Sequence, residues 1–154
     1  MRLRQAPAAM NIQWEHYLWT EPHPVDSQVL DRLEQQWKIK LPALYRELVS
    51  AYQGMGPEPC AFDVGTGNDA FSVLLIVSAD REKESYSVNN VHRVLEPHVP
   101  AGIFPFALTP GGEYLCFDYR DSSHQPRVVL VTAGMSIHPV ADDFTSFMDG
   151  LYNG

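Results

Sequence analysis

The sequence predicts a single α+β domain, built on an antiparallel and in part mixed β-sheet of about five to six strands with helices packed around it. Its 154 residues suit one domain. Apolar residues recur at helical spacing early in the chain and again near its end. Between these parts, short β-branched and aromatic runs alternate with glycine and proline turns. Strands joined by such short turns must pair antiparallel.

The two helices expected near the start carry clear end signals. The first covers residues 27–38, with Asp26 as its N-cap, because the carboxylate can accept hydrogen bonds from free amides of the first turn. The second opens at Pro42, where a missing N–H costs nothing, and Gly54 and Gly56 stop it. Helices this close in sequence should form a hairpin.

The remaining elements are predicted from a change in the spacing of apolar residues, from helical spacing to short runs typical of strands. The apolar run at residues 71–77 is predicted to be a central strand, and residues 80–95 a helix. Gly111 and Gly112 join two strands in a hairpin, and a last helix begins after Asp142 or Asp143. The predicted strands are residues 60–64, 71–77, 103–108, 113–119, 128–132 and 136–140, with turns at 65–69 and 121–126.

The first part of the chain is set apart from the domain. We expect residues 1–24 to be an N-terminal extension and residues 25–154 to be the domain. Residues 1–10 are basic and too weakly apolar for a signal peptide, so they are interpreted as a vector remnant or as an early start ahead of Met10. The aromatic residues within 11–24 fit either a short helix or an arm packed on the body.

Composition and charge exclude several classes of partner. The formal net charge is −8 and the pI is near 5.1, so nucleic acid and anionic membrane surfaces would be repelled, whereas a basic protein would be attracted. The alternative is that the acidic surface only keeps the protein soluble. No apolar run approaches the length of a membrane span. Cys60 and Cys116 are too few for a disulfide framework and are interpreted as small buried hydrophobes in a reducing compartment, which predicts a cytoplasmic protein.

No motif for catalysis stands out. The histidines are scattered rather than spaced as zinc ligands, and neither a Gly-x-Ser-x-Gly elbow nor a phosphate-binding loop is present. We therefore predict no catalytic residue, no metal, no cofactor and no enzymatic activity.

Five carboxylates remain as candidate partner-binding residues. They are Glu113, Asp118, Asp121, Asp142 and Asp143. The competing interpretation makes them turn and cap residues on a solvated face, with Asp118 satisfying a local backbone donor. A catalytic pair among them is the less favoured reading.

Two groups of residues resemble a known family. The first group is the Leu-Pro helix start at residues 41–48 with the glycine-containing stop at 53–57. The second group begins with the Pro-Phe-Ala run at 103–107 and the Gly-Gly turn. It continues with the Leu-Cys-Phe-Asp run at 115–118, followed by Val128 and Val129. In order and spacing they resemble the SUKH superfamily, also called Smi/Knr-like, over residues 27–150. The sequence departs from the family pattern at 53–56, where Asn-Gly-Gly is usual, and its aromatic arm does not align. Residues that match the family pattern are expected to be mainly structural: Leu41, Pro42, Tyr45, Pro105, Phe106, Gly112 and Asp118.

The resemblance implies a protein-binding function. Bacterial SUKH proteins are typically immunity proteins that bind and neutralise a cognate polymorphic toxin in the cytoplasm, and many of those toxins are nucleases. An acidic inhibitor would suit a basic nuclease. The first hypothesis is such an immunity protein, with the five carboxylates as contacts. The alternatives are a regulatory or scaffold module with another intracellular partner, as in fungal relatives, and an enzyme with a carboxylate or cysteine site.

Overall fold

The computed structural model describes residues 11–154, so the expectations for residues 1–10 lie outside the described residues. The elements in chain order are β1 (Gln13–His16), α1 (Ser27–Trp37), α2 (Ala43–Tyr52), β2 (Met55–Glu58), β3 (Ala61–Val64), β4 (Gly67–Ala70), β5 (Val73–Leu74), the 3-10 segment η2 (Arg81–Tyr86), α3 (Val88–Leu95), β6 (Ile103–Leu108), β7 (Tyr114–Asp118), β8 (Arg127–Val131), β9 (Ile137–Ala141) and α4 (Phe144–Asp149).

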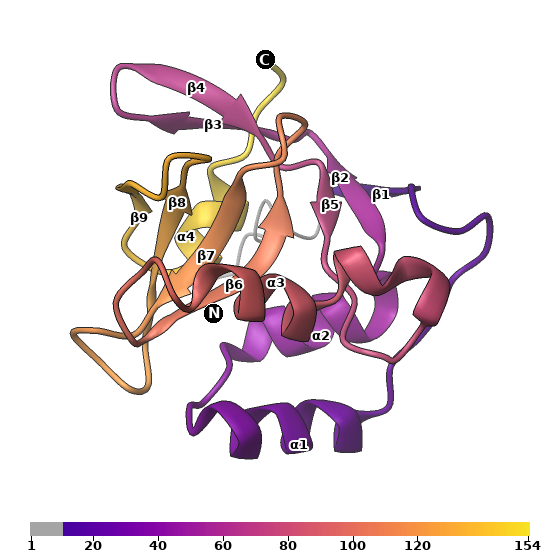
Figure 1. Ribbon diagram of the computed structural model, residues 1–154. Coiled ribbons are helices and arrows are strands. Elements are labelled where there is room, and N and C mark those ends of the chain that lie inside the picture. Colours follow the sequence, from indigo (N-terminus) through magenta and orange to yellow (C-terminus); the bar gives the residue numbers. More distant parts are fainter. Residues whose placement is uncertain (1–10) are drawn as a thin grey trace, which may run out of the picture.

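The predicted α+β class is confirmed. A five-stranded antiparallel sheet has the order β5-β6-β7-β8-β9, and two small sheets pair β1 with β2 and β3 with β4. Helices α1 and α2 lie below the large sheet in Figure 1, and the β3–β4 hairpin projects at the top beside the C-terminus. Consecutive strands of the large sheet from β6 onward are joined by short connections, which is why they pair antiparallel.

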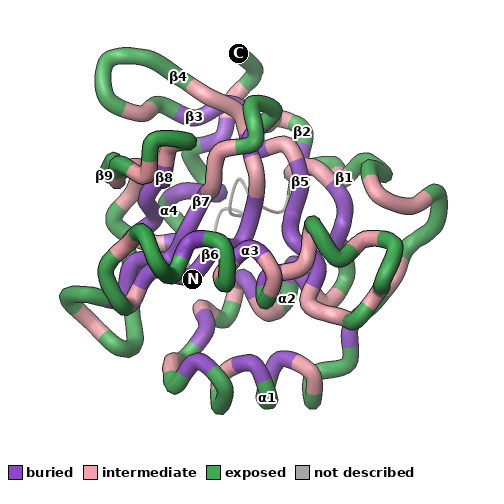
Figure 2. Tube along the Cα trace, viewed as in Figure 1, coloured by how far each residue is buried: buried purple, intermediate pink, exposed green. Residues whose placement is uncertain are grey.

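The core lies between the large sheet and helices α2 and α4. Tyr45 from α2, Phe106 and Phe117 from the sheet and Phe144 from α4 are all at most 2% exposed and pack edge to face or stacked on one another. Fully burying a side chain such as phenylalanine contributes about 1.5–3 kcal/mol, so these four rings are a large part of the stability of the core. Figure 2 shows the buried residues running along the large sheet, whereas the tip of the β3–β4 hairpin is exposed.

The helical hairpin forms as predicted. The Asp26 carboxylate accepts a hydrogen bond from the Gln28 amide at 2.9 Å, which confirms the N-cap of α1. Pro42 lies one residue earlier than predicted, at the N-cap of α2. Arg46 of α2 joins the helices, since its guanidinium contacts both Asp31 and Glu34 of α1 at 2.7 Å.

The aromatic arm is a strand rather than a helix. Residues 13–16 pair antiparallel with β2, so the helical alternative for this segment is wrong and the packed arm is correct. Strand β2 was not predicted, because its Gly-Pro sequence reads as the end of α2. Gly54 has φ +76° and reverses the chain, and a Cβ at Gly56 would lie 2.3 Å from the Ser72 carbonyl oxygen. Only glycine permits β2 to approach so closely.

Three other expectations need correction. The predicted central strand at 71–77 is the two-residue edge strand β5. Its apolar residues are nevertheless buried: Phe71 packs on Phe106 and Phe147, and the Ile76 backbone accepts from the Val88 amide and donates to the Tyr86 carbonyl. The predicted helix at 80–95 is η2 followed by α3, with a non-helical kink at Lys83. The predicted turn at 65–69 is narrower, because Gly67–Ala70 already forms β4.

Candidate partner-binding surface

The structure brings four of the five predicted carboxylates to one end of the large sheet. In the strand register, Asp118 lies opposite Arg127, and the next residue of β8 lies opposite Ala141, directly before Asp142 and Asp143. Asp121 belongs to the same end, since its carboxylate lies 3.3 Å from Arg127. Glu113 precedes the opposite end of β7 and is therefore separate from the other four.

Asp118 has a structural role. It is only 8% exposed, and its carboxylate accepts hydrogen bonds from the backbone amide and the guanidinium of Arg120 at 2.8–3.0 Å. Burial alone would raise the pKa of Asp118, but these hydrogen bonds and the charges of Arg120 and Arg127 lower it below its usual value overall. The predicted bond to a local backbone donor is therefore confirmed.

Three of the other carboxylates also have intramolecular partners, and one of them is Asp121 with its ion pair to Arg127. Asp143 caps α4 by accepting from the Ser146 amide at 2.7 Å, and Glu113 accepts from the Ala133 amide at 3.2 Å. Asp142 is exposed, and within residues 11–154 it has no hydrogen bond or ion pair. The turn-and-cap interpretation therefore describes most of the set.

Positive charge is confined to part of the molecule. Apart from Arg2 and Arg4, which are not described, the basic residues fall into three groups. They are Arg32, Lys38, Lys40 and Arg46 on the α1–α2 hairpin, Arg81, Lys83 and Arg93 on η2 and α3, and Arg120 and Arg127 at the β7–β8 connection.

Strands β1–β4 carry acidic residues and neither Lys nor Arg. We call these four strands the acidic pole; their carboxylates belong to Glu15, Glu58, Asp63 and Asp69. The sequence contained this signal, since no Lys or Arg occurs between Arg46 and Arg81. Net charge alone does not reveal this signal, because it depends on how the charges are distributed along the chain.

Two carboxylates of the acidic pole flank a groove of about 230 Å³. Glu58 lies opposite Gln13 and Gly56 lies opposite Glu15, so the two glutamates share one face of the β1–β2 pair. Both also act on Cys60: burial raises the pKa of its thiol, and the charges of Glu58 and Glu15 raise it further. Tyr17 lines the same groove and is 53% exposed.

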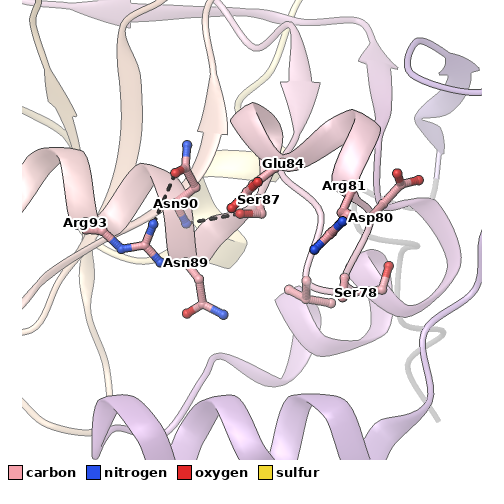
Figure 3. A pocket seen from close by; sticks show the side chains of 10 residues that line it. Ser78, Asp80, Arg81, Glu84, Ser87, Asn89, Asn90 and Arg93 are labelled. Atoms are coloured by element: carbon pink, nitrogen blue, oxygen red, sulfur yellow. Dashed lines mark hydrogen bonds between the residues drawn. The ribbon is translucent and has the colours of Figure 1, made fainter.

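A larger polar pocket of about 460 Å³ lies beside the start of α3. Figure 3 shows the side chains of Arg81 and Arg93 extending into this region from opposite sides. The lining also contains Asp80, whose carboxylate caps η2 by accepting from the Glu82 amide at 3.0 Å, and Glu84. Its lining charges are therefore balanced, unlike those of the acidic pole.

A third hollow, of about 280 Å³, lies between the end of α1, the end of α3 and the start of β6. We call it the aromatic pocket, because Trp37, His92 and Phe104 line it together with Glu96. His92 stacks on Phe104 with ring centroids 5.0 Å apart, and Trp37 lies 4.7 Å from Phe104. Burial lowers the pKa of His92 despite the opposing charge of Glu96, which favours the neutral imidazole.

The thiols and histidines form no metal centre in the part of the chain described here, where no three His, Cys, Asp or Glu side chains are grouped to hold an ion. Cys116 is fully buried, as predicted, and burial raises its pKa well above the usual value. Cys60 is only partly buried, so the expectation of two buried cysteines is correct for Cys116 alone. No helix within residues 11–154 has the length and apolar character needed to cross a bilayer.

Comparison with known proteins agrees with the architecture. The model of the SMI1 / KNR4 family (SUKH-1) matches residues 24–150, which is most of the chain and includes the helical hairpin, the large sheet and α4. No curated protein and no solved structure gives a significant match. The match over this span shows that the chain belongs to the SMI1/KNR4 family, within the SUKH superfamily.

Proposed function

We propose that this chain is a non-catalytic protein-binding domain that acts as an immunity protein, neutralising a cognate polymorphic toxin in the cytoplasm by binding it. The observation that carries the proposal is the combination of SUKH-1 membership with an acidic pole that has no Lys or Arg. A basic toxin domain, such as a nuclease, has the complementary charge. It need not touch all of the carboxylates predicted from sequence, because most of them are engaged inside the protein.

Charge segregation supports binding in a direct physical way. Oppositely charged faces steer two proteins into encounter, and this raises association rates by about 10- to 1,000-fold at low salt. Glu15 and Glu58 are exposed, and the described chain provides no hydrogen bond or ion pair to either carboxylate. They are therefore available to a partner without first breaking an internal contact.

The thiols support a non-catalytic role. A cysteine nucleophile acts as its thiolate. The pKa values of both Cys60 and Cys116 are raised, and burial is the largest cause of the shift in each case. Both thiols therefore stay protonated near neutral pH. Neutralisation by simple occlusion requires neither a thiolate nor a cofactor.

The test is co-purification with the toxin candidate encoded beside this gene, together with protection of cells that express that toxin. We expect a stable complex and full protection. The double variant Glu15→Lys, Glu58→Lys should slow association about tenfold at low salt, and less at high salt, because salt screens exposed charges. Glu82→Lys on η2 is the matched control and should leave the rate unchanged. Absence of a complex at micromolar concentration would refute the proposal, and binding of another intracellular partner without protection would favour a regulatory module.

A further inference from the structure

The aromatic pocket has a lining suited to a planar cation. Trp37, His92 and Phe104 form one cluster, with every pair of ring centroids at most 5.4 Å apart. Among residues 11–154, Glu96 is the only carboxylate in the lining, and neither Lys nor Arg lines it. Aromatic faces attract cations through their quadrupole, and the attraction is stronger where water is partly excluded.

The hydrogen-bonding groups around the pocket include acceptors that a cationic ligand can use. Gln36 uses its side-chain NH₂ to donate to Asn89 at 2.9 Å, which leaves its carbonyl oxygen free to accept. Pro100 contributes a residue without an N–H to the rim. A ligand here therefore meets the Glu96 carboxylate, an amide oxygen and aromatic rings. The same lining carries two ring N–H donors, that of Trp37, which is buried without a hydrogen-bond partner in the described chain, and that of the His92 imidazole.

We propose that the aromatic pocket binds an arginine side chain presented by a protein. The guanidinium is planar, stacks on aromatic rings and donates in its own plane, so it can use the rings and the two acceptors at once. A lysine ammonium is a compact, strongly hydrated charge and uses ring faces less well. The pocket lies among α1, α3 and β6, away from strands β1–β4, so this site is independent of the acidic pole.

The charges and the exposure of the residues near the aromatic pocket determine how an arginine side chain could be bound there. Arg93 on α3 and Lys38 after α1 are close in sequence, but neither lines the pocket. Glu96 follows α3 and is exposed, so its charge can be removed without opening the core. Trp37 and Phe104 are each 8% exposed, so an incoming side chain reaches only a small part of these two rings, and the half-buried His92 ring offers it more surface.

The experiment titrates the full chain with Nα-acetyl-arginine-methylamide and follows the indole and imidazole signals of Trp37 and His92 by NMR. The matched probe is Nα-acetyl-citrulline-methylamide, which has nearly the same shape without the charge. We expect saturable shifts at both residues with the arginine probe and at least about tenfold weaker binding of the citrulline probe. The Glu96→Gln variant should weaken arginine binding to the same degree, whereas Glu82→Gln should not.

Two results would overturn the inference. One is the absence of saturable shifts at Trp37 and His92 with the arginine probe. The other is equal binding of arginine and citrulline probes, which would show that the pocket does not recognise charge. Either result would leave the toxin-binding proposal intact, because that proposal depends on the acidic pole and is read from complex formation.

Discussion

Tyr45 provides the sharpest test of the packing described above. Its side chain is 1% exposed and its ring packs against Phe106, Phe117 and Phe144, with centroids 5.1–6.3 Å away. Its hydroxyl is buried, and no group in the described chain hydrogen-bonds to it. Burial also raises the pKa of this hydroxyl, so it stays neutral. The ring therefore stabilises the core, while the hydroxyl opposes it.

The expected effect of Tyr45→Phe follows from this arrangement. A buried hydroxyl without a hydrogen-bond partner costs about 1–3 kcal/mol. Removing it also loses a few dispersion contacts, so we expect a net stabilisation of about 1 kcal/mol. For a chain of this size, that corresponds to a rise in Tm of about 2–4 °C.

Tyr119→Phe is the matched control. Tyr119 is also buried in the same aromatic core, but its hydroxyl donates to the Lys40 carbonyl at 2.6 Å. Losing this bond should lower the free energy of unfolding by about 1 kcal/mol. Thermal and urea unfolding followed by far-UV circular dichroism measure both variants. A destabilised Tyr45→Phe variant, or the same sign for the two variants, would refute the reasoning and indicate a bound water or another partner at Tyr45.

Three further substitutions test other parts of the fold, each by urea unfolding. Asp118→Asn should cost about 1–2 kcal/mol at pH 7 by weakening the charge-assisted bonds to Arg120. Because the folded-state pKa of Asp118 is lowered, this deficit should be full above pH 3.8 and should shrink as the pH falls further; a constant deficit would contradict that shift. Gly56→Ala should cost about 1–3 kcal/mol, since its Cβ would lie 2.3 Å from the Ser72 carbonyl oxygen, and a neutral result would show that β2 can move away. Asp143→Ala should cost about 0.5–2 kcal/mol as a lost N-cap, and an unchanged stability would mean that α4 needs no cap.

The parts of the fold that could be predicted are those determined by residues close together in the sequence. The α1 cap at Asp26, the hairpin at Gly111-Gly112 and the strands β6–β9 could all be predicted because capping, turn chemistry and alternation act over a few residues. The strand β2 could not, because it pairs with β1, about 40 residues earlier, and owes its place to that partner. The same holds for residues 71–77, an edge segment whose Phe71 is buried by the distant residues Trp14 and Phe147.

The candidate partner-binding residues also differ in whether their partners are close in sequence. Asp118 and Asp143 could be recognised as local hydrogen-bonding residues, since their partners Arg120 and Ser146 are two and three residues away. The aromatic pocket could not be predicted, because Trp37, His92 and Phe104 come from three distant elements. The acidic pole is an intermediate case. The sequence shows that residues 47–80 contain no Lys or Arg, but only the structure shows that its four carboxylates lie on strands β1–β4.

The carboxylates of the acidic pole differ in how far they contribute to the fold, and this difference has a consequence for binding. The β3–β4 hairpin joins the body near the C-terminus, through the backbone pair of Ala61 with Tyr152 and the hydrogen bond from Tyr152 to Asp63. Its inward-facing Phe62 packs on Phe147, while the tip at Gly65 stays exposed. Asp63 therefore helps to hold the hairpin, whereas Glu15 and Glu58 have no hydrogen bond or ion pair in the described chain. Substitutions at these two glutamates change the charge that a partner meets without removing such a contact, so specificity for a partner can vary while stability stays nearly constant.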